Sequence, residues 1–133
     1  MQVVRAERDF MAVVLVVEDD AFICELTELT VQDWGHQTFA ANDVDEALSI
    51  LRSPLHIDLL FTDIYLKMAI VGGFDLAREG IKLRPQLRVL YTTGNYITDA
   101  MKALFLDDAE CIRKPYTPHQ LQTSFEHLLA AHS

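Results

Sequence analysis

Acidic residues stand at the downstream ends of two apolar runs of strand length. Glu18 and Asp19 follow the run 12–17, and Asp63 ends the run that begins at Leu59. Ligands in an open α/β sheet bind outside the carboxyl ends of the strands, so we expect these carboxylates to meet at one sheet edge. Like charges at that distance raise one another's pKa unless a cation lies among them. The alternative is that each acid only terminates a strand at a solvated surface.

Two further strand ends carry polar residues. Thr93 is followed by Gly94, and Lys114 is followed by Pro115. With the acids, they supply a carboxylate nucleophile, ligands for a divalent metal and donors for moving oxygens, which phosphoryl transfer requires. Mg²⁺ is the expected ion because it prefers hard oxygen ligands. Separately, a Thr-Gly pair is usually a turn and a Lys-Pro pair a surface kink. Their joint occurrence at four strand ends favours phosphoryl chemistry.

The elements that position these residues alternate between strand and helix along the chain. The apolar runs predict strands over 12–17, 37–41, 59–63, 87–92 and 110–113. Helical spacing, caps and Pro or Gly breakers predict five helices. Their markers are the stripe Phe22, Leu26, Leu29 and Trp34 stopped by Gly35, the stripe 44–51 capped by Asn42 or Asp43, the segment from Gly72 to Arg84, the residues Ile97, Met101 and Leu104, and the segment from Pro118. This alternation predicts a doubly wound α/β fold with a parallel five-stranded sheet covered by helices on both faces.

Length and composition limit the possible classes of protein. The 133 residues, half of them apolar, predict one domain over 12–133 preceded by a leader over 1–11. The formal net charge of −9 argues against direct nucleic-acid binding. No apolar run reaches the length of a membrane span, and no convincing signal peptide is present, so we expect a cytoplasmic protein. Cys24 and Cys111 are isolated and fit neither a disulfide framework nor a zinc site.

The chain resembles the receiver domains of two-component response regulators over about residues 12–131. The motifs that carry the resemblance are Val16-Val17-Glu18-Asp19-Asp20, Phe61-Thr62-Asp63, Tyr91-Thr92-Thr93-Gly94 and Lys114-Pro115. The resemblance implies a flavodoxin-like fold with strand order 2-1-3-4-5. It also implies that Asp63 accepts a phosphoryl group from a sensor histidine kinase or a histidine phosphotransfer protein.

The same resemblance implies a metal site at the acidic residues. Asp19 and Asp63 would bind Mg²⁺ directly, together with the backbone carbonyl of Tyr65, while Glu18 would act through water. The phosphoryl group would be held from the other side. Thr93 would hydrogen-bond it, Lys114 would pair with it and Gly94 would leave room for it. A cis Lys114-Pro115 peptide bond is also expected.

Four positions depart from the family's usual pattern or tune its chemistry. Cys111 stands where the family usually has the aromatic ring that moves with the threonine; Tyr91, Tyr96 or Tyr116 are the candidate substitutes, and simple packing is the alternative for each. Lys67 replaces a common proline, and the loop to Gly72 is about two residues longer than usual; Lys67 is either solvated or a contact for the donor protein. Tyr65 and Asn95 occupy positions that tune the access of water to the acyl phosphate, and we expect Tyr65 to shield it.

Function is expected to be signalling and not turnover of a substrate. The resemblance implies a protein that catalyses only its own phosphorylation and dephosphorylation, then acts by phosphorylation-dependent protein binding or phosphorelay. No output domain follows the domain, so a stand-alone receiver is expected, with a possible homodimer through the helix near Met101, the strand 110–113 and the last helix. The alternative is a haloacid-dehalogenase-like Mg²⁺ phosphohydrolase, which wants a second carboxylate where this chain has Tyr65. A scaffold that has lost phosphorylation would lack an active-site residue, and none is missing.

Overall fold

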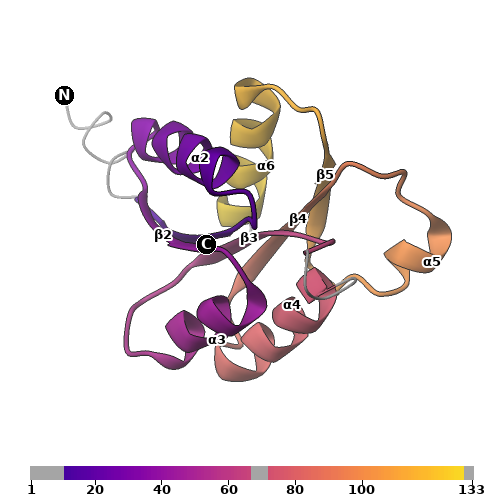
Figure 1. The fold of residues 1–133 in the computed structure, drawn as a ribbon, viewed down its shortest axis with the longest axis horizontal. Coiled ribbons are helices and arrows are strands. Elements are labelled where there is room, and N and C mark those ends of the chain that lie inside the picture. The colour runs from indigo at the N-terminus through magenta and orange to yellow at the C-terminus, as the bar shows by residue number, and fades with distance from the viewer. Residues whose placement is uncertain (1–10, 67–71, 131–133) are drawn as a thin grey trace.

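The structure, a computed structural model, describes residues 11–66 and 72–130. Five strands and five helices alternate in these ranges (Figure 1). The strands are β1 (Val13–Val17), β2 (Gln37–Ala41), β3 (Leu59–Asp63), β4 (Arg88–Thr93) and β5 (Glu110–Arg113). The helices are α2 (Ala21–Asp33), α3 (Val44–Arg52), α4 (Gly72–Leu83), α5 (Asp99–Lys102) and α6 (Pro118–Ala130). Every predicted strand is present. Strand β1 begins one residue later than predicted, and β4 is displaced by one residue at each end.

The five strands form one parallel sheet in the order β2-β1-β3-β4-β5. The predicted doubly wound, flavodoxin-like topology is therefore confirmed. The register aligns Val17 with Thr62, Asp63 with Thr92, and Thr93 with Arg113 in successive strand pairs. Because all strands run in the same direction, this register brings the ends of β1, β3, β4 and β5 to the same edge of the sheet.

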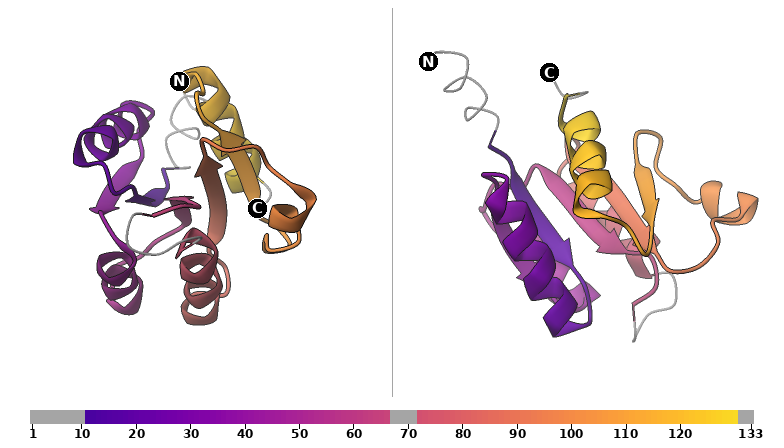
Figure 2. Two further views of the ribbon diagram at one scale, coloured as in Figure 1. Left: turned by 45° about the vertical axis from the view of Figure 1, so that its right-hand side comes forward. Right: turned by 90° about the horizontal axis from the view of Figure 1, so that it is seen from above.

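Helices cover both faces of the sheet, as the alternation of elements predicts. Helices α2 and α6 lie on one face, and α3 and α4 lie on the other (Figures 1 and 2). The side chains of each strand alternate between two apolar cores, so that Leu15 and Leu60 point to the α3–α4 side, whereas Val16 and Phe61 point to the α2–α6 side. Strands buried on both faces need continuous apolar runs, which explains the sequence pattern of β1 and β3.

Helix α2 is present where its apolar stripe predicts it, but of the four stripe residues only Trp34, at the C-cap, packs against the core. The side chains of Phe22, Leu26 and Leu29 are 70%, 48% and 56% exposed. The buried face of α2 is formed instead by the smaller residues Cys24, Thr27 and Val31. The smaller side chains thus face the sheet, and the larger apolar side chains are left in contact with solvent. Gly35 ends the helix with a φ of 95°, a backbone conformation that glycine adopts without strain.

Helix α5 is shorter than the spacing of its apolar residues predicts. It is a single turn capped by the Thr98 hydroxyl, which accepts a hydrogen bond from the Met101 N–H group at 3.1 Å. Of the three marker residues, only Met101 lies in the helix and is buried. Leu104 follows the helix and is 52% exposed. The helix expected near Met101 is therefore confirmed as α5, but it is shorter than predicted.

Some expectations fall on residues that the structure does not describe. Lys67 and the predicted loop up to Val71 lie outside the described residues, as do residues 1–10 of the predicted leader. Among the helices in the described ranges, none combines the length and apolar character that crossing a bilayer requires. Cys24 is buried and Cys111 is half-buried, and both thiols are free.

Candidate functional site

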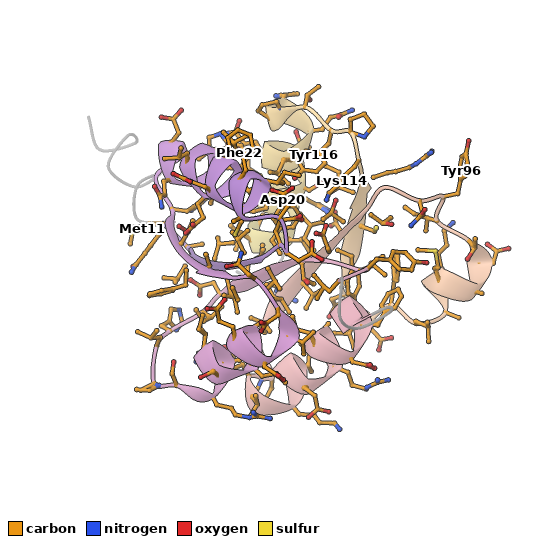
Figure 3. All side chains as sticks on the ribbon, viewed as in Figure 1. Met11, Asp20, Phe22, Tyr96, Lys114 and Tyr116 are labelled. Atoms are coloured by element: carbon orange, nitrogen blue, oxygen red, sulfur yellow. The ribbon has the colours of Figure 1, made fainter. Side chains whose placement is uncertain are left out.

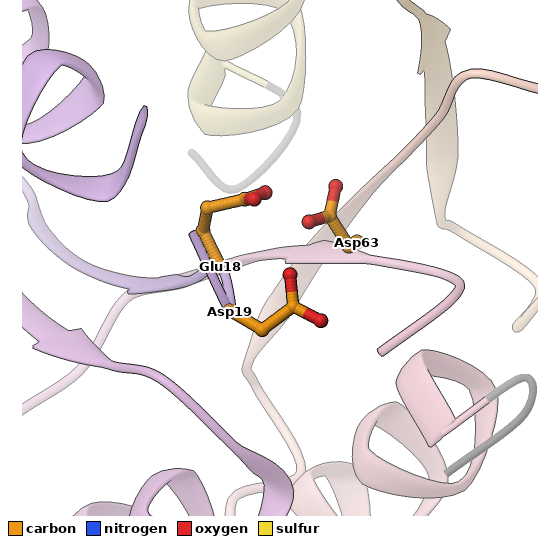
Figure 4. Close-up of side chains that lie close together, drawn as sticks. All are labelled: Glu18, Asp19 and Asp63. Atoms are coloured by element: carbon orange, nitrogen blue, oxygen red, sulfur yellow. The ribbon is translucent and has the colours of Figure 1, made fainter. Parts of the chain in front are cut away.

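Three acidic side chains gather at the carboxyl edge of the sheet. Glu18 and Asp19 follow β1 and Asp63 ends β3, and one carboxylate oxygen from each lies within 4.8 Å of the others (Figure 4). Glu18 and Asp63 are buried, with 6% and 5% of their surfaces exposed. Carboxylate oxygens are the hard ligands that suit a divalent cation such as Mg²⁺. The three acids that the sequence predicts to converge are therefore brought together.

Lys114 places its ammonium group among these acids. Its Nζ atom lies 2.9 Å from Oδ1 of Asp63 and 3.3 Å from Oε2 of Glu18. The lysine reaches this position from the end of β5, and its backbone N–H group donates a hydrogen bond to the Thr93 carbonyl at 2.8 Å. The Lys114-Pro115 peptide bond is cis, as expected. The sequence motif at the end of β5 thus contributes directly to the acidic cluster.

Burial and charge shift the pKa values of the two central groups in the same direction. Burial and the neighbouring Glu18 carboxyl group raise the pKa of Asp63 to about 8, although Lys114 acts in the opposite direction. Burial by itself would lower the pKa of Lys114, but the hydrogen bond and charge of Asp63, with the charge of Glu18, raise it above the usual value. Near neutral pH the raised pKa values favour the protonated forms of both Asp63 and Lys114.

The end of β4 contributes a hydroxyl group and open space. Thr93 is buried, and its Oγ1 atom accepts a hydrogen bond from the Asn95 N–H group at 3.1 Å. The hydroxyl hydrogen of Thr93 is not used in that bond, so it remains available to a ligand. A Cβ atom built on Gly94 meets no atom within 4 Å. The backbone at Gly94 thus borders open space, and its role beside a phosphoryl group stays a prediction.

The segment after Asp63 packs tightly against the start of α4. The Gly73 N–H group donates a hydrogen bond to the Ile64 carbonyl at 3.0 Å. A Cβ atom at Gly73 would lie 2.1 Å from the backbone oxygen of Asp63, closer than any real contact. Tyr65 is 40% exposed beside the site. The positions of its carbonyl as a metal ligand and of its ring as a shield stay predictions.

Two features of the site are not evident from the sequence. Glu18, expected to act only through water at the metal, also pairs with Lys114. Asn42, at the end of β2, donates a hydrogen bond from Nδ2 to the backbone carbonyl of Glu18 at 3.0 Å. Its own N–H group donates to the Glu46 carboxylate. In the sequence, the signal for these two hydrogen bonds is a polar residue directly after the strand that pairs with β1. This signal can be interpreted only when the strand order is known.

A family model for the response regulator receiver domain matches residues 14–126 of the chain. Among curated proteins, the chain is 30% identical over 118 residues to the transcriptional regulatory protein ZraR of Klebsiella oxytoca, covering 88% of this chain and 26% of that protein. It is 28% identical over 121 residues to the response regulator SaeR of Staphylococcus epidermidis, covering 90% of this chain and 51% of that protein. The chain therefore spans about half or less of the length of these relatives.

Solved structures of similar proteins share the whole fold. A response regulator receiver protein from Sinorhizobium medicae superposes with a TM-score of 0.84 at 26% identity, covering 92% of this chain and 98% of that one. A CheY-like receiver domain protein from Methanospirillum hungatei gives a TM-score of 0.82 at 25% identity, with 92% and 96% covered. The likeness thus extends over nearly the full length of both structures.

Proposed function

The chain belongs to the response regulator receiver domain family, and on that premise we propose that Asp63 accepts a phosphoryl group from a phosphohistidine. The donor would be a sensor histidine kinase or a histidine phosphotransfer protein. The observation that carries the proposal is the buried Asp63 carboxylate with the Lys114 ammonium 2.9 Å away and two further acids beside it. This arrangement offers a nucleophile, a fixed positive charge and ligands for a metal within one pocket.

The proposed transfer uses one oxygen of the Asp63 carboxylate as the nucleophile. This oxygen forms a bond to phosphorus while the bond between phosphorus and the donor imidazole nitrogen breaks, and the electron pair of that bond stays on the imidazole. Asp63 must be ionised before it attacks, so the proton that its raised pKa retains has to leave first. Lys114, already within contact distance of Oδ1, then pairs with the transferred group.

The acidic cluster fits the metal that this family chemistry requires. Asp19 and Asp63 would hold Mg²⁺, with the Tyr65 carbonyl as a further ligand. When bound, Mg²⁺ would supply positive charge that neutralises the acids and the phosphoryl oxygens. Glu18, which also pairs with Lys114, would act at the metal through water.

The remaining predicted residues have proposed roles around the phosphoryl group. The Thr93 hydroxyl would donate a hydrogen bond to a phosphoryl oxygen, because that hydrogen is not used in the bond with Asn95. Gly94 would leave room for the group, in keeping with the open space at its Cα. Tyr65 and Asn95 would govern the approach of water to the acyl phosphate. Signalling would follow through phosphorylation-dependent binding of another protein or through phosphorelay, with a homodimer as one possible form of that binding.

Hydrolysis of external phosphomonoesters is the weaker candidate. A haloacid-dehalogenase-like enzyme needs a carboxyl group as general acid two residues after its nucleophilic aspartate. The residue at that position here is Tyr65, which offers no carboxyl group. The chain is accordingly proposed to act as a phosphoacceptor that catalyses only its own phosphorylation and dephosphorylation.

Incubation with a small phosphodonor and Mg²⁺, followed by intact mass spectrometry, tests this proposal. We expect one phosphoryl adduct on the wild-type chain and none on Asp63→Asn, which keeps the shape of the side chain but removes the nucleophilic carboxylate. Glu25→Gln is the matched control, because this acid lies on the outer side of α2, and it should form the adduct as the wild type does. Steady release of phosphate from monoesters without an adduct would instead support the hydrolase.

A further inference from the structure

An exposed cation–π contact joins the loop after β4 to the end of β5. The guanidinium carbon of Arg113 lies 4.0 Å from the centroid of the Tyr96 ring. Tyr96 is 75% exposed and projects at the outer end of its loop, away from the layers of the fold (Figure 3). A cation over an aromatic ring at this distance is attracted by the ring quadrupole. The contact therefore favours one conformation of a loop that otherwise has few restraints.

Tyr96 is connected to Thr93 through the preceding residue, Asn95. The Oγ1 atom of Thr93 accepts a hydrogen bond from the Asn95 N–H group at 3.1 Å, and Asn95 immediately precedes Tyr96. A movement of the Thr93 hydroxyl toward Asp63 would draw the Asn95 backbone with it. Because Tyr96 is the next residue, its ring would leave the position over Arg113.

Arg113 is connected to the site through the next residue, Lys114. Arg113 is the residue before Lys114 and pairs with Thr93 in the sheet register. The Lys114 N–H group is bonded to the Thr93 carbonyl at 2.8 Å. Arg113 is thus held by the ladder between β4 and β5 and provides a fixed point. Thr93 and Lys114, proposed to hold the phosphoryl group, are thus both connected to the same surface contact.

The other tyrosines near the site are not placed to move in this way. Tyr91 is the register neighbour of Cys111, but it is fully buried and its ring packs against Phe74 and Phe105 at 5.1 and 5.0 Å. Tyr116 packs on Phe61, on the opposite face of the sheet from Cys111. Of the three tyrosines that are candidate substitutes for an aromatic ring at position 111, Tyr96 alone is exposed and follows the residue bonded to Thr93.

We propose that the Tyr96–Arg113 contact holds the β4–α5 loop in its unphosphorylated conformation and opens when Thr93 engages the phosphoryl group on Asp63. The inference rests on the proposed function. It makes Tyr96 a positioning residue that acts through Thr93, and it assigns to this loop the role that Cys111 cannot perform. Because opening the contact opposes phosphoryl binding, loss of the Tyr96 ring should tighten the binding of a phosphoryl analogue about two- to fivefold.

The test is calorimetric titration of the full chain with beryllofluoride in the presence of Mg²⁺. Tyr96→Leu should bind the analogue about two- to fivefold more tightly than the wild type. Tyr96→Phe keeps the ring face and should match the wild type. Arg113→Gln also removes a positive charge near an anion site, so its own effect is not diagnostic. In the Arg113→Gln background, however, Tyr96→Leu should change the affinity no further, because the contact is already absent.

A substitution of an exposed aliphatic residue on the far side of α5 provides the matched control. Leu104→Ala, 52% exposed beyond α5, should leave the affinity unchanged. Equal or weaker binding by Tyr96→Leu, or the same tightening in both Arg113 backgrounds, would overturn the inference while leaving the proposed function intact. If the wild-type chain itself binds no beryllofluoride, the proposed function fails and the inference falls with it.

Discussion

Magnesium binding should depend steeply on pH, because the metal must displace a proton from the acidic cluster. Asp63 is almost fully buried, and burial and the Glu18 carboxyl group raise its pKa to about 8, against the opposing effect of Lys114. Mg²⁺ binds the ionised carboxylate, so a proton competes with the metal at every pH below that value.

The magnitude follows from this single competing proton. The apparent dissociation constant is multiplied by one plus the ratio of proton concentration to the acid constant of Asp63. With a pKa of about 8, this factor grows by about fiftyfold between pH 8 and pH 6. Binding at pH 6 should also release close to one proton per Mg²⁺, and the release should decline above pH 8.

Isothermal titration calorimetry at several pH values, in two buffers of different ionisation enthalpy, measures both quantities. Asp63→Asn provides the control, because it keeps a neutral side chain of similar shape that has no proton to lose. Its weaker Mg²⁺ binding should show little dependence on pH in this range. An equal affinity of the wild-type chain at pH 6 and pH 8, with no proton release, would show that Asp63 is ionised throughout and would refute the reasoning.

Further predictions concern stability. Gly73→Ala should lower the free energy of unfolding by on the order of 2–4 kcal/mol, since its Cβ would overlap the Asp63 backbone oxygen, whereas Gly94→Ala should be tolerated; chemical denaturation measures both. Leu29→Ser should change stability by less than about 0.5 kcal/mol in the same assay and the buried Val31→Ser by several times more. The raised pKa of Asp63 stabilises the fold at low pH, and this stability is lost as pH rises from about 4 through about 8. Asp63→Asn should therefore raise the melting temperature more at pH 8 than at pH 5, corresponding to on the order of 4 kcal/mol, and a uniform shift would contradict this assignment.

The fold and the central residues of the site can be predicted because their signals are local. A fully buried parallel strand needs a continuous apolar run, and the acid at its end is adjacent in sequence, as at Asp63 and Glu18. The parallel topology then places four strand ends at one edge, so the meeting of Lys114 with Asp63 follows from the order of the strands. Few alternative arrangements are compatible with these constraints.

Other features depend on packing that periodicity does not specify. Along α2, the residues Phe22, Leu26 and Leu29 and the residues Cys24, Thr27 and Val31 form two interleaved stripes with similar spacing. The larger apolar stripe predicts the helix correctly but suggests the wrong buried face, because the fit against the sheet favours the smaller side chains.

Contacts between distant residues are equally hidden in the sequence. Asn42 and the backbone of Glu18 are 24 residues apart, and their hydrogen bond depends on the pairing of β1 with β2. The approach of Arg113 to Tyr96 depends on the path of the loop after β4. Both are consequences of the folded chain, and a residue pattern alone gives no reason to connect them.

The most direct test of the account is to locate the phosphoryl group chemically. After reaction with a phosphodonor and Mg²⁺, reduction with borohydride converts an acyl phosphate of aspartate to homoserine, which tandem mass spectrometry of the peptides can assign to one position. The account predicts homoserine at residue 63 and at no other acid, and its loss when Mg²⁺ is chelated before the reaction. Homoserine at Asp19, the corresponding reduced glutamate at Glu18, a phosphoryl group on another residue type, or a chain that reacts at no position would contradict it.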